Sequence, residues 1–178
     1  MPKAKLQIRP NLSVDIVYVG RKFHAQLQYL NSVRTGRKPS ETLTQQYRGT
    51  EKWHAGRLAR ELSPVAADSA ILKPPSSRTD ADAYLSAVLA ANANLIDISE
   101  RMTRNGKIKA ATANSLGAVI KELNYAPKGD EATFNDLYII DETVGTGRTV
   151  AAILYHLCKA GLRKDCRVVV ATALWVDP

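Results

Sequence analysis

Two adjacent acids precede a run of glycines and threonines in the last third of the chain. The acids are Asp141 and Glu142, and the run that follows consists of Val144, Gly145, Thr146, Gly147, Arg148 and Thr149. Glycines let backbone N–H groups turn toward a ligand, threonine hydroxyls donate hydrogen bonds and Arg148 adds a cation, so the run suits a phosphate dianion. Carboxylates repel phosphate, and we therefore expect the two acids to face sugar hydroxyls or a Mg²⁺ ion on the same ligand.

The surrounding pattern predicts where this run lies in the fold. Residues 137–140 are continuously apolar, as in a buried strand, and residues 141–149 are expected to form the loop that follows it. Residues 150–160 form an apolar helix closed by Gly161, and residues 167–176 form a second apolar strand. A strand, helix, strand order implies a parallel sheet covered on both faces, and ligands bind such sheets at the carboxyl ends of the strands.

A second candidate loop follows an earlier strand. Residues 69–72 are predicted to form a short buried strand, and the loop after it consists of Lys73, Pro74, Pro75, Ser76, Ser77 and Arg78. This loop offers free backbone N–H groups, two hydroxyls and two cations, and it opens a helix expected over residues 81–96. A second anion site is one interpretation, and a proline-rich turn before a helix is the other.

Established nucleotide loops do not fit the run after residue 140. The P-loop needs G-x-x-x-x-G-K-[ST] and the dinucleotide fingerprint needs a third glycine, and neither spacing is present. Residues 137–149 instead resemble the motif of the type I phosphoribosyltransferases that binds 5-phosphoribosyl 1-pyrophosphate (PRPP): four apolar residues, two acids and a phosphate loop ending in Thr or Ser. The loop at residues 73–78 resembles the pyrophosphate loop of the family, in particular the Pro-Ser-Ser stretch of its ComF-like bacterial members.

The resemblance implies a glycosyltransferase that binds PRPP, or a related phosphorylated ribose, with Mg²⁺. Asp141 and Glu142 would then be the catalytic acids holding the ribose hydroxyls, residues 144–149 would bind the 5′-phosphate, and residues 73–78 would bind pyrophosphate. The Mg²⁺ would be held mainly by the ligand. A mobile basic loop closes over pyrophosphate in the family, and its candidates are Arg101, Arg104, Lys107 and Lys109. Many relatives are dimers, which favours a homodimer.

Two departures from the family pattern bear on the acceptor that would receive the ribose 5-phosphate. Purine-salvage members carry an acid three residues after the acidic pair, where this chain has Gly145. That argues against a hypoxanthine–guanine enzyme. The resemblance also covers only residues 55–178, so the hood that selects the nucleobase is expected from a basic segment over residues 1–54.

The charge of the chain is concentrated in its first third. Residues 1–60 hold twelve Lys and Arg against three Asp and Glu, which gives this segment a net charge of +9, while the whole chain carries +8. This excess indicates either a solubilising face or a phosphate partner, including nucleic acid. A non-catalytic regulator that senses a nucleotide and binds nucleic acid, through residues such as Arg34, Arg37 and Lys38, is therefore the alternative function. A hydrolase or effector, in which water replaces the base, is a third.

Composition limits the remaining classes. With 178 residues, 45% apolar and 24% charged, the chain is long enough for a one-domain core. It has no long uncharged apolar run and no secretory signal, and Cys158 and Cys166 are too few for a disulfide framework. These features predict a cytoplasmic protein without a membrane partner, with both cysteines in the core.

The rest of the chain has a weaker pattern. We expect a strand over residues 14–19, helices over residues 21–33, 54–62 and 110–123, a polar stretch of weak periodicity over residues 41–52, and a basic, mobile stretch over residues 99–109. Tyr18 and Trp53 could stack on a nucleobase, although core packing is the stronger expectation. The three histidines are expected to be core or surface residues, and the general base is not identified.

Overall fold

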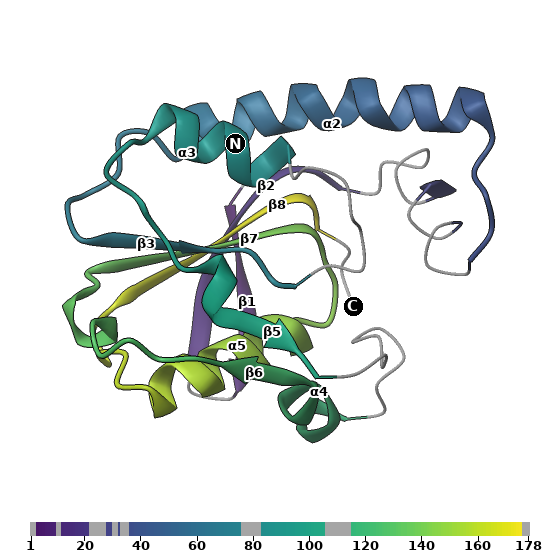
Figure 1. Cartoon of the computed structure of the whole chain (residues 1–178). Coiled ribbons are helices and arrows are strands. Elements are labelled where there is room, and N and C mark those ends of the chain that lie inside the picture. Colours follow the sequence, from purple (N-terminus) through teal and green to yellow (C-terminus); the bar gives the residue numbers. More distant parts are fainter. Residues whose placement is uncertain are drawn as a thin grey trace.

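A six-stranded sheet forms the centre of the computed structural model, which describes residues 3–9, 12–21, 28–29, 32, 36–75, 83–105 and 115–175 (Figure 1). The strand order is β1-β2-β8-β7-β3-β4. β1 is antiparallel to β2, and the other neighbours are parallel. The strands are β1 (Lys3–Arg9), β2 (Leu12–Arg21), β3 (Ser69–Leu72), β4 (Ile96–Asp97), β7 (Asp136–Val144) and β8 (Arg167–Trp175). The predicted α/β class with a mainly parallel sheet is confirmed.

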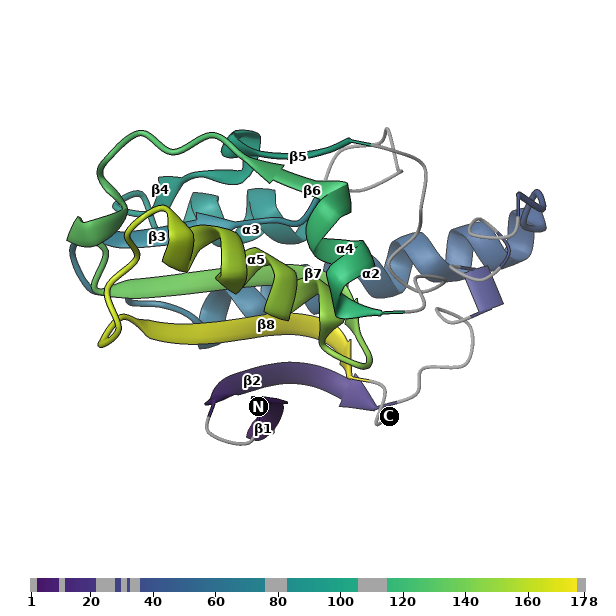
Figure 2. The same ribbon diagram turned by 90° about the horizontal axis from the view of Figure 1, so that it is seen from below.

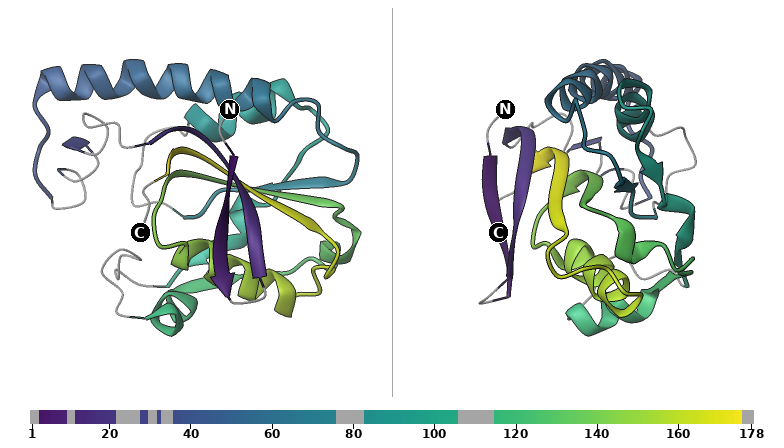
Figure 3. Two further views of the ribbon diagram at one scale, coloured as in Figure 1. Left: turned by 180° about the vertical axis from the view of Figure 1, so that it is seen from behind. Right: turned by 90° about the vertical axis from the view of Figure 1, so that its left-hand side faces the viewer.

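Helices cover both faces of this sheet, as expected for parallel strands. One face packs against α2 (Glu41–Glu61) and α3 (Ala83–Ala91). The other face packs against α4 (Leu116–Glu122), α5 (Arg148–Lys159) and a two-stranded sheet of β5 (Met102–Arg104) and β6 (Leu123–Tyr125). Figures 2 and 3 show the sheet between these two layers. Short 3-10 helices, η1 (Ser99–Arg101) and η2 (Glu131–Thr133), join the smaller elements.

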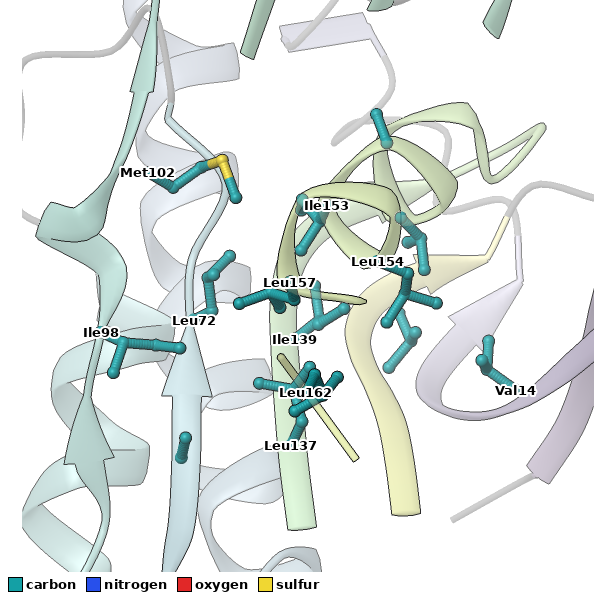
Figure 4. Close-up of a cluster of buried hydrophobic side chains, with 14 of the residues drawn as sticks. Val14, Leu72, Ile98, Met102, Leu137, Ile139, Ile153, Leu154, Leu157 and Leu162 are labelled. Atoms are coloured by element: carbon teal, nitrogen blue, oxygen red, sulfur yellow. The ribbon is translucent and has the colours of Figure 1, made fainter. Parts of the chain in front are cut away.

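Alternation along β7 explains why its sequence is apolar without a break. Leu137 and Ile139 belong to the core on the α5 side, whereas Tyr138 and Ile140 belong to the core on the α2 and α3 side. In Figure 4, side chains of α5, including Leu157, lie against the sheet residues of the core on the α5 side. A strand buried on both faces has apolar side chains on each face, so polar and apolar residues do not alternate along its sequence.

α2 is one helix of 21 residues, where the sequence predicted a weakly periodic stretch followed by a short helix. Ser40 caps it, with the Leu43 N–H donating to Ser40 Oγ at 3.2 Å. Its buried face includes the polar side chains of Tyr47, Glu51 and His54, which hide the apolar period that a helix normally shows. The helix predicted over residues 21–33 lies largely outside the described residues.

The N-terminal segment shares the central sheet. β2 pairs in parallel with β8 over Asp15 to Arg21, and β1 extends the sheet beyond it. α2 runs continuously through residue 54, where the sequence placed the end of the basic segment. The first half of α2 extends past the carboxyl ends of the strands (Figures 1 and 2).

His54 is fully buried in the middle of α2. Burial, together with the positive charge of Arg57, lowers the pKa of His54 from 6.5 to about 4. The unfolded chain takes up a proton near pH 6.5 but the folded chain resists it down to about pH 4, so stability is full above pH 6.5 and falls between these values. We expect the free energy of unfolding, measured with urea, to decrease from pH 7 to pH 5 by at most about 1.4 kcal/mol per pH unit. His54→Asn should flatten this dependence, and an equal drop in the variant would contradict the assignment.

Two further expectations concern the surface. Within the described ranges, no helix combines the length and apolar character that crossing a membrane requires. Cys166 is half-buried, and burial raises the pKa of its thiol to about 11. Cys158 is exposed on α5, which corrects the prediction that both cysteines lie in the core.

Candidate functional site

The two strands that precede the predicted ligand loops are neighbours in the sheet. β3 and β7 are parallel neighbours, with Leu72 opposite Ile139, so the residues that follow each strand emerge at the same edge. From β3 the chain continues to α3 on one face of the sheet, and from β7 it continues to α5 on the other. A point where successive connections diverge to opposite faces is where open α/β sheets form their ligand crevice. The topology thus brings together loops that are about 70 residues apart in the sequence.

β7 is longer than predicted. It continues through Val144 because β8 supplies partners to the end, with Asp141 opposite Thr172 and Val144 opposite Trp175. The loop is therefore reduced to Gly145–Gly147, and α5 begins at Arg148. Asp141 and Glu142 lie in the strand rather than in the loop, and Thr149 lies in the first turn of the helix.

Asp141 and Glu142 are both half-buried at the carboxyl end of β7. Successive side chains of a strand point to opposite faces, so Asp141 continues the row of Leu137 and Ile139, whereas Glu142 continues the row of Tyr138 and Ile140. The two carboxylates therefore straddle the sheet edge.

The turn from β7 to α5 requires a glycine at its last position. Gly147 has φ 69° and ψ 6°, the left-handed region that side chains other than glycine rarely adopt. Its carbonyl accepts the first helical hydrogen bond of α5, from the Ala151 N–H at 2.9 Å. Gly147 is buried, Gly145, Arg148 and Thr149 are half-buried, and Thr146 is exposed.

The residue that precedes α5 has no side chain with which to cap the helix. α2 and α4 start at Ser40 and Ser115, whose hydroxyls accept from backbone N–H groups of their first turns at 3.2 Å. Gly147 takes the same position in α5 and offers no side-chain acceptor. The first N–H groups of a helix need acceptors and carry the positive end of its dipole, so this helix start suits an external anion.

The loop after β3 differs from its prediction in one respect. The Lys73 N–H donates to Ser99 Oγ at 2.9 Å, and that hydroxyl donates to Asp97 Oδ1 at 2.6 Å. Pro74 and Pro75 have no N–H, so the described half of this loop offers no free backbone donor, contrary to expectation. Lys73 and Pro75 are half-buried and Pro74 is buried. Ser76, Ser77 and Arg78 lie outside the described residues.

Arg101 is not part of a mobile basic loop. Ser99–Arg104 form η1 and β5, and β5 pairs with β6. The Arg101 guanidinium is buried and donates to Asp130 Oδ2 at 2.8 Å and to Glu131 Oε1 at 3.4 Å. These hydrogen bonds with Asp130 hold the pKa of Arg101 above its usual value. Because Arg101 is buried and bonded to two acids, its role is to stabilise the fold. Arg104 is a half-buried residue at the end of β5. Lys107 and Lys109 lie outside the described residues.

Two other candidates also have structural roles. His156 lies on α5, where its Nε2 is 3.0 Å from the Ile120 carbonyl of α4, so it joins two helices. Tyr18 is buried in the core on the α5 side, as expected.

Trp53 is exposed, with 53% of its surface accessible, against the expectation of core packing. Sequence reasoning missed this because it divided α2 into two pieces. A single helix over residues 41–61 places position 53 opposite Tyr47 and Leu58, which is the signal that would have shown it.

The donors at the edge fit Mg²⁺ bound together with a phosphorylated ligand. Proteins commonly hold this ion by one or two carboxylates plus substrate phosphates, and Asp141 and Glu142 supply hard oxygen donors of that kind. In the part of the chain that the structure describes, no group of three or more His, Cys, Asp or Glu side chains is arranged to hold a metal ion.

Neither the protein-family models nor the curated proteins give a match to this chain.

Proposed function

We propose that this chain binds PRPP with Mg²⁺ at the carboxyl ends of β3 and β7 and transfers its ribose 5-phosphate to a nitrogen acceptor. The observation that carries the proposal is the adjacency of these two strands, whose connections diverge to opposite faces of the sheet. This supports one ligand spanning both loops, because PRPP carries phosphate groups on opposite ends of its sugar. The resemblance of residues 137–149 to the type I phosphoribosyltransferases supplies the identity of the ligand.

Each part of PRPP has a matching group along this edge. The 5′-phosphate would accept from the N–H groups at the start of α5 and from the hydroxyls of Thr146 and Thr149. The ribose hydroxyls would donate to Asp141 and Glu142. The pyrophosphate would lie toward Lys73, whose loop starts one strand away.

The reaction follows from charge. The C1–O bond to pyrophosphate breaks, a bond forms between C1 and a nitrogen of the acceptor, and that nitrogen loses its proton to a base. Positive charge develops on the ribose ring as the bond breaks, and negative charge leaves with pyrophosphate. The chain's residues orient the sugar between acceptor and leaving group, which needs no covalent nucleophile. Bound Mg²⁺ would neutralise part of the leaving charge.

The N-terminal segment is proposed to contribute to acceptor binding. The first half of α2 overhangs the carboxyl edge at which PRPP would bind (Figure 1). Gly145 leaves no acid in the loop to contact a purine, which favours an acceptor other than hypoxanthine or guanine.

Thr149→Val should weaken PRPP binding by about 1–3 kcal/mol, since the variant loses a hydrogen bond to a charged phosphate while keeping its shape. Titration calorimetry measures this difference. Thr133→Val is the matched control, because Thr133 is also a helical threonine but lies in η2, before β7 and at the opposite edge of the sheet from the loop. Equal affinity of Thr149→Val and the parent chain would mean that the loop does not hold the phosphate.

Transfer is tested by pyrophosphate release from PRPP in the presence of nucleobases and other nitrogen acceptors. Release that depends on one acceptor supports the transferase. Saturable binding of PRPP without release under any acceptor favours the non-catalytic sensor, and ribose 5-phosphate release without acceptor favours the hydrolase.

A further inference from the structure

The solvent face of α2 combines an exposed aromatic ring with positive charge. Trp53 is the most exposed of the large apolar side chains that the structure describes, and the Arg57 guanidinium lies over its ring at 5.4 Å from the centroid. Lys52 and Arg60 are exposed on the same helix. Packing in the hydrophobic core does not account for a tryptophan at position 53, because the buried positions of α2 lie on the opposite side of the helix.

Two glycines flank Trp53 on its face of α2, while Arg57 covers one side of the ring and the tilted ring of His54 has its centroid 5.0 Å away. Gly49 and Gly56 stand four residues before it and three residues after it, so they occupy the adjoining turns of the same face. A Cβ built on either glycine meets nothing within 4 Å. A flat group that stacks on the part of the ring not covered by Arg57 can therefore lie close to the helix backbone beside Gly49 or Gly56.

The charge on this stretch has one sign. Between Gly49 and Arg60 the single acid is Glu51, and it is buried, with Tyr47 donating to it at 3.2 Å. The exposed acids of α2, Glu41 and Glu61, stand at its two ends. A second copy of the chain would bring Arg57 and Arg60 against themselves, which like charges oppose. A negatively charged partner complements the face.

We propose that this face of α2 binds single-stranded nucleic acid, with a base stacked on Trp53 and phosphates on Lys52, Arg57 and Arg60. Stacking on an exposed aromatic side chain needs an unpaired base, which a duplex does not present. Backbone phosphates spaced along the strand then meet cations one helical turn apart. The inference does not depend on PRPP binding, because it uses none of the residues at the carboxyl edge of the sheet.

The test is fluorescence anisotropy of the full chain with a labelled 20-nucleotide oligo(dT), an oligo(U) of the same length and a 20-base-pair duplex. Trp53→Leu should weaken single-strand binding by about fivefold or more, the range for losing one stacked base. Neutralising Lys52, Arg57 and Arg60 together with Gln should reduce the salt slope by about 2, which corresponds to three single-strand phosphates. Circular dichroism checks that both variants stay folded.

The matched control replaces Lys128, Lys159 and Lys164 with Gln, which makes the same charge change at exposed positions in the C-terminal half. It should leave the affinity within about twofold. Equal losses in the control and the α2 variants would overturn the proposal, as would no binding at 50 mM salt. Duplex or polyglutamate binding as tight as oligo(dT) binding would also overturn it, in favour of general attraction to anions.

Discussion

The double variant Asp141→Asn/Glu142→Gln is expected to lose PRPP binding by at least about 100-fold while keeping its fold. Two carboxylates that accept hydrogen bonds from ribose hydroxyls contribute roughly 1.5–3 kcal/mol each, and amides accept more weakly. Both side chains are half-buried at the end of β7, so neutral replacements of the same shape leave the cores on either face unchanged. Titration calorimetry measures the affinity, and thermal melting checks the fold.

A matched control for that variant is Glu61→Gln/Asp165→Asn. Both residues are exposed, and Asp165 precedes β8 at the opposite edge of the sheet from the site. The control makes the same change in net charge and should bind PRPP like the parent chain. Retained affinity in the Asp141→Asn/Glu142→Gln variant would show that the acids do not hold the sugar.

Glu131→Gln is expected to reduce the free energy of unfolding by about 3–5 kcal/mol, the scale for breaking a buried ion pair. Glu131 is fully buried and accepts from the Tyr125 hydroxyl at 2.9 Å, the Lys128 N–H at 3.0 Å and the Gly129 N–H at 2.9 Å. Its contacts with Arg101 and Tyr125 join η1 and β6 to the segment that precedes β7. A glutamine nitrogen cannot accept these bonds, so at least one buried donor loses its partner. Urea unfolding measures the loss.

The same cluster predicts the response to acid. Burial alone raises the pKa of Glu131, but the backbone hydrogen bonds from Lys128 and its neighbours outweigh it, and the net pKa is lowered. The hydrogen bond from Arg101 lowers the pKa of Asp130. Stability from both groups is therefore present above the pKa of the unfolded acids, near 4, and is lost as the pH falls below it. The Glu131→Gln variant should lose less stability below pH 4 than the parent chain.

The control for this prediction is Glu100→Gln, at an exposed position of η1 beside Arg101 in the sequence. Its free energy of unfolding should stay within about 0.5 kcal/mol of that of the parent chain, as for surface substitutions in general. A Glu131→Gln variant as stable as Glu100→Gln would contradict the structural role assigned to the cluster.

Local sequence predicted the elements that bury a continuous apolar run. β3 was predicted with its observed bounds, and the strand–helix–strand unit from β7 to β8 differs from prediction only at its ends. These elements are apolar because the sheet is covered on both faces, and that property is written in consecutive residues.

The features that sequence could not provide depend on residues distant in the chain. β7 extends to Val144 because β8 pairs with it, and Arg101 is buried because Asp130 and Glu131 meet it from another loop. The single helix α2 was hidden by polar residues on its buried face, with Glu51 and Tyr47 satisfying each other. The divergence of the connections from β3 and β7 is likewise a property of topology, and no local pattern encodes it.

Calorimetric titration of the purified chain with PRPP, with and without Mg²⁺, tests the central claim most directly. We expect saturable binding to one site per chain, strengthened by Mg²⁺ because the ion would neutralise part of the charge of the ligand phosphates. No binding of PRPP, with Mg²⁺ present and the fold intact, would contradict it and would leave the carboxyl edge of β3 and β7 to a different ligand.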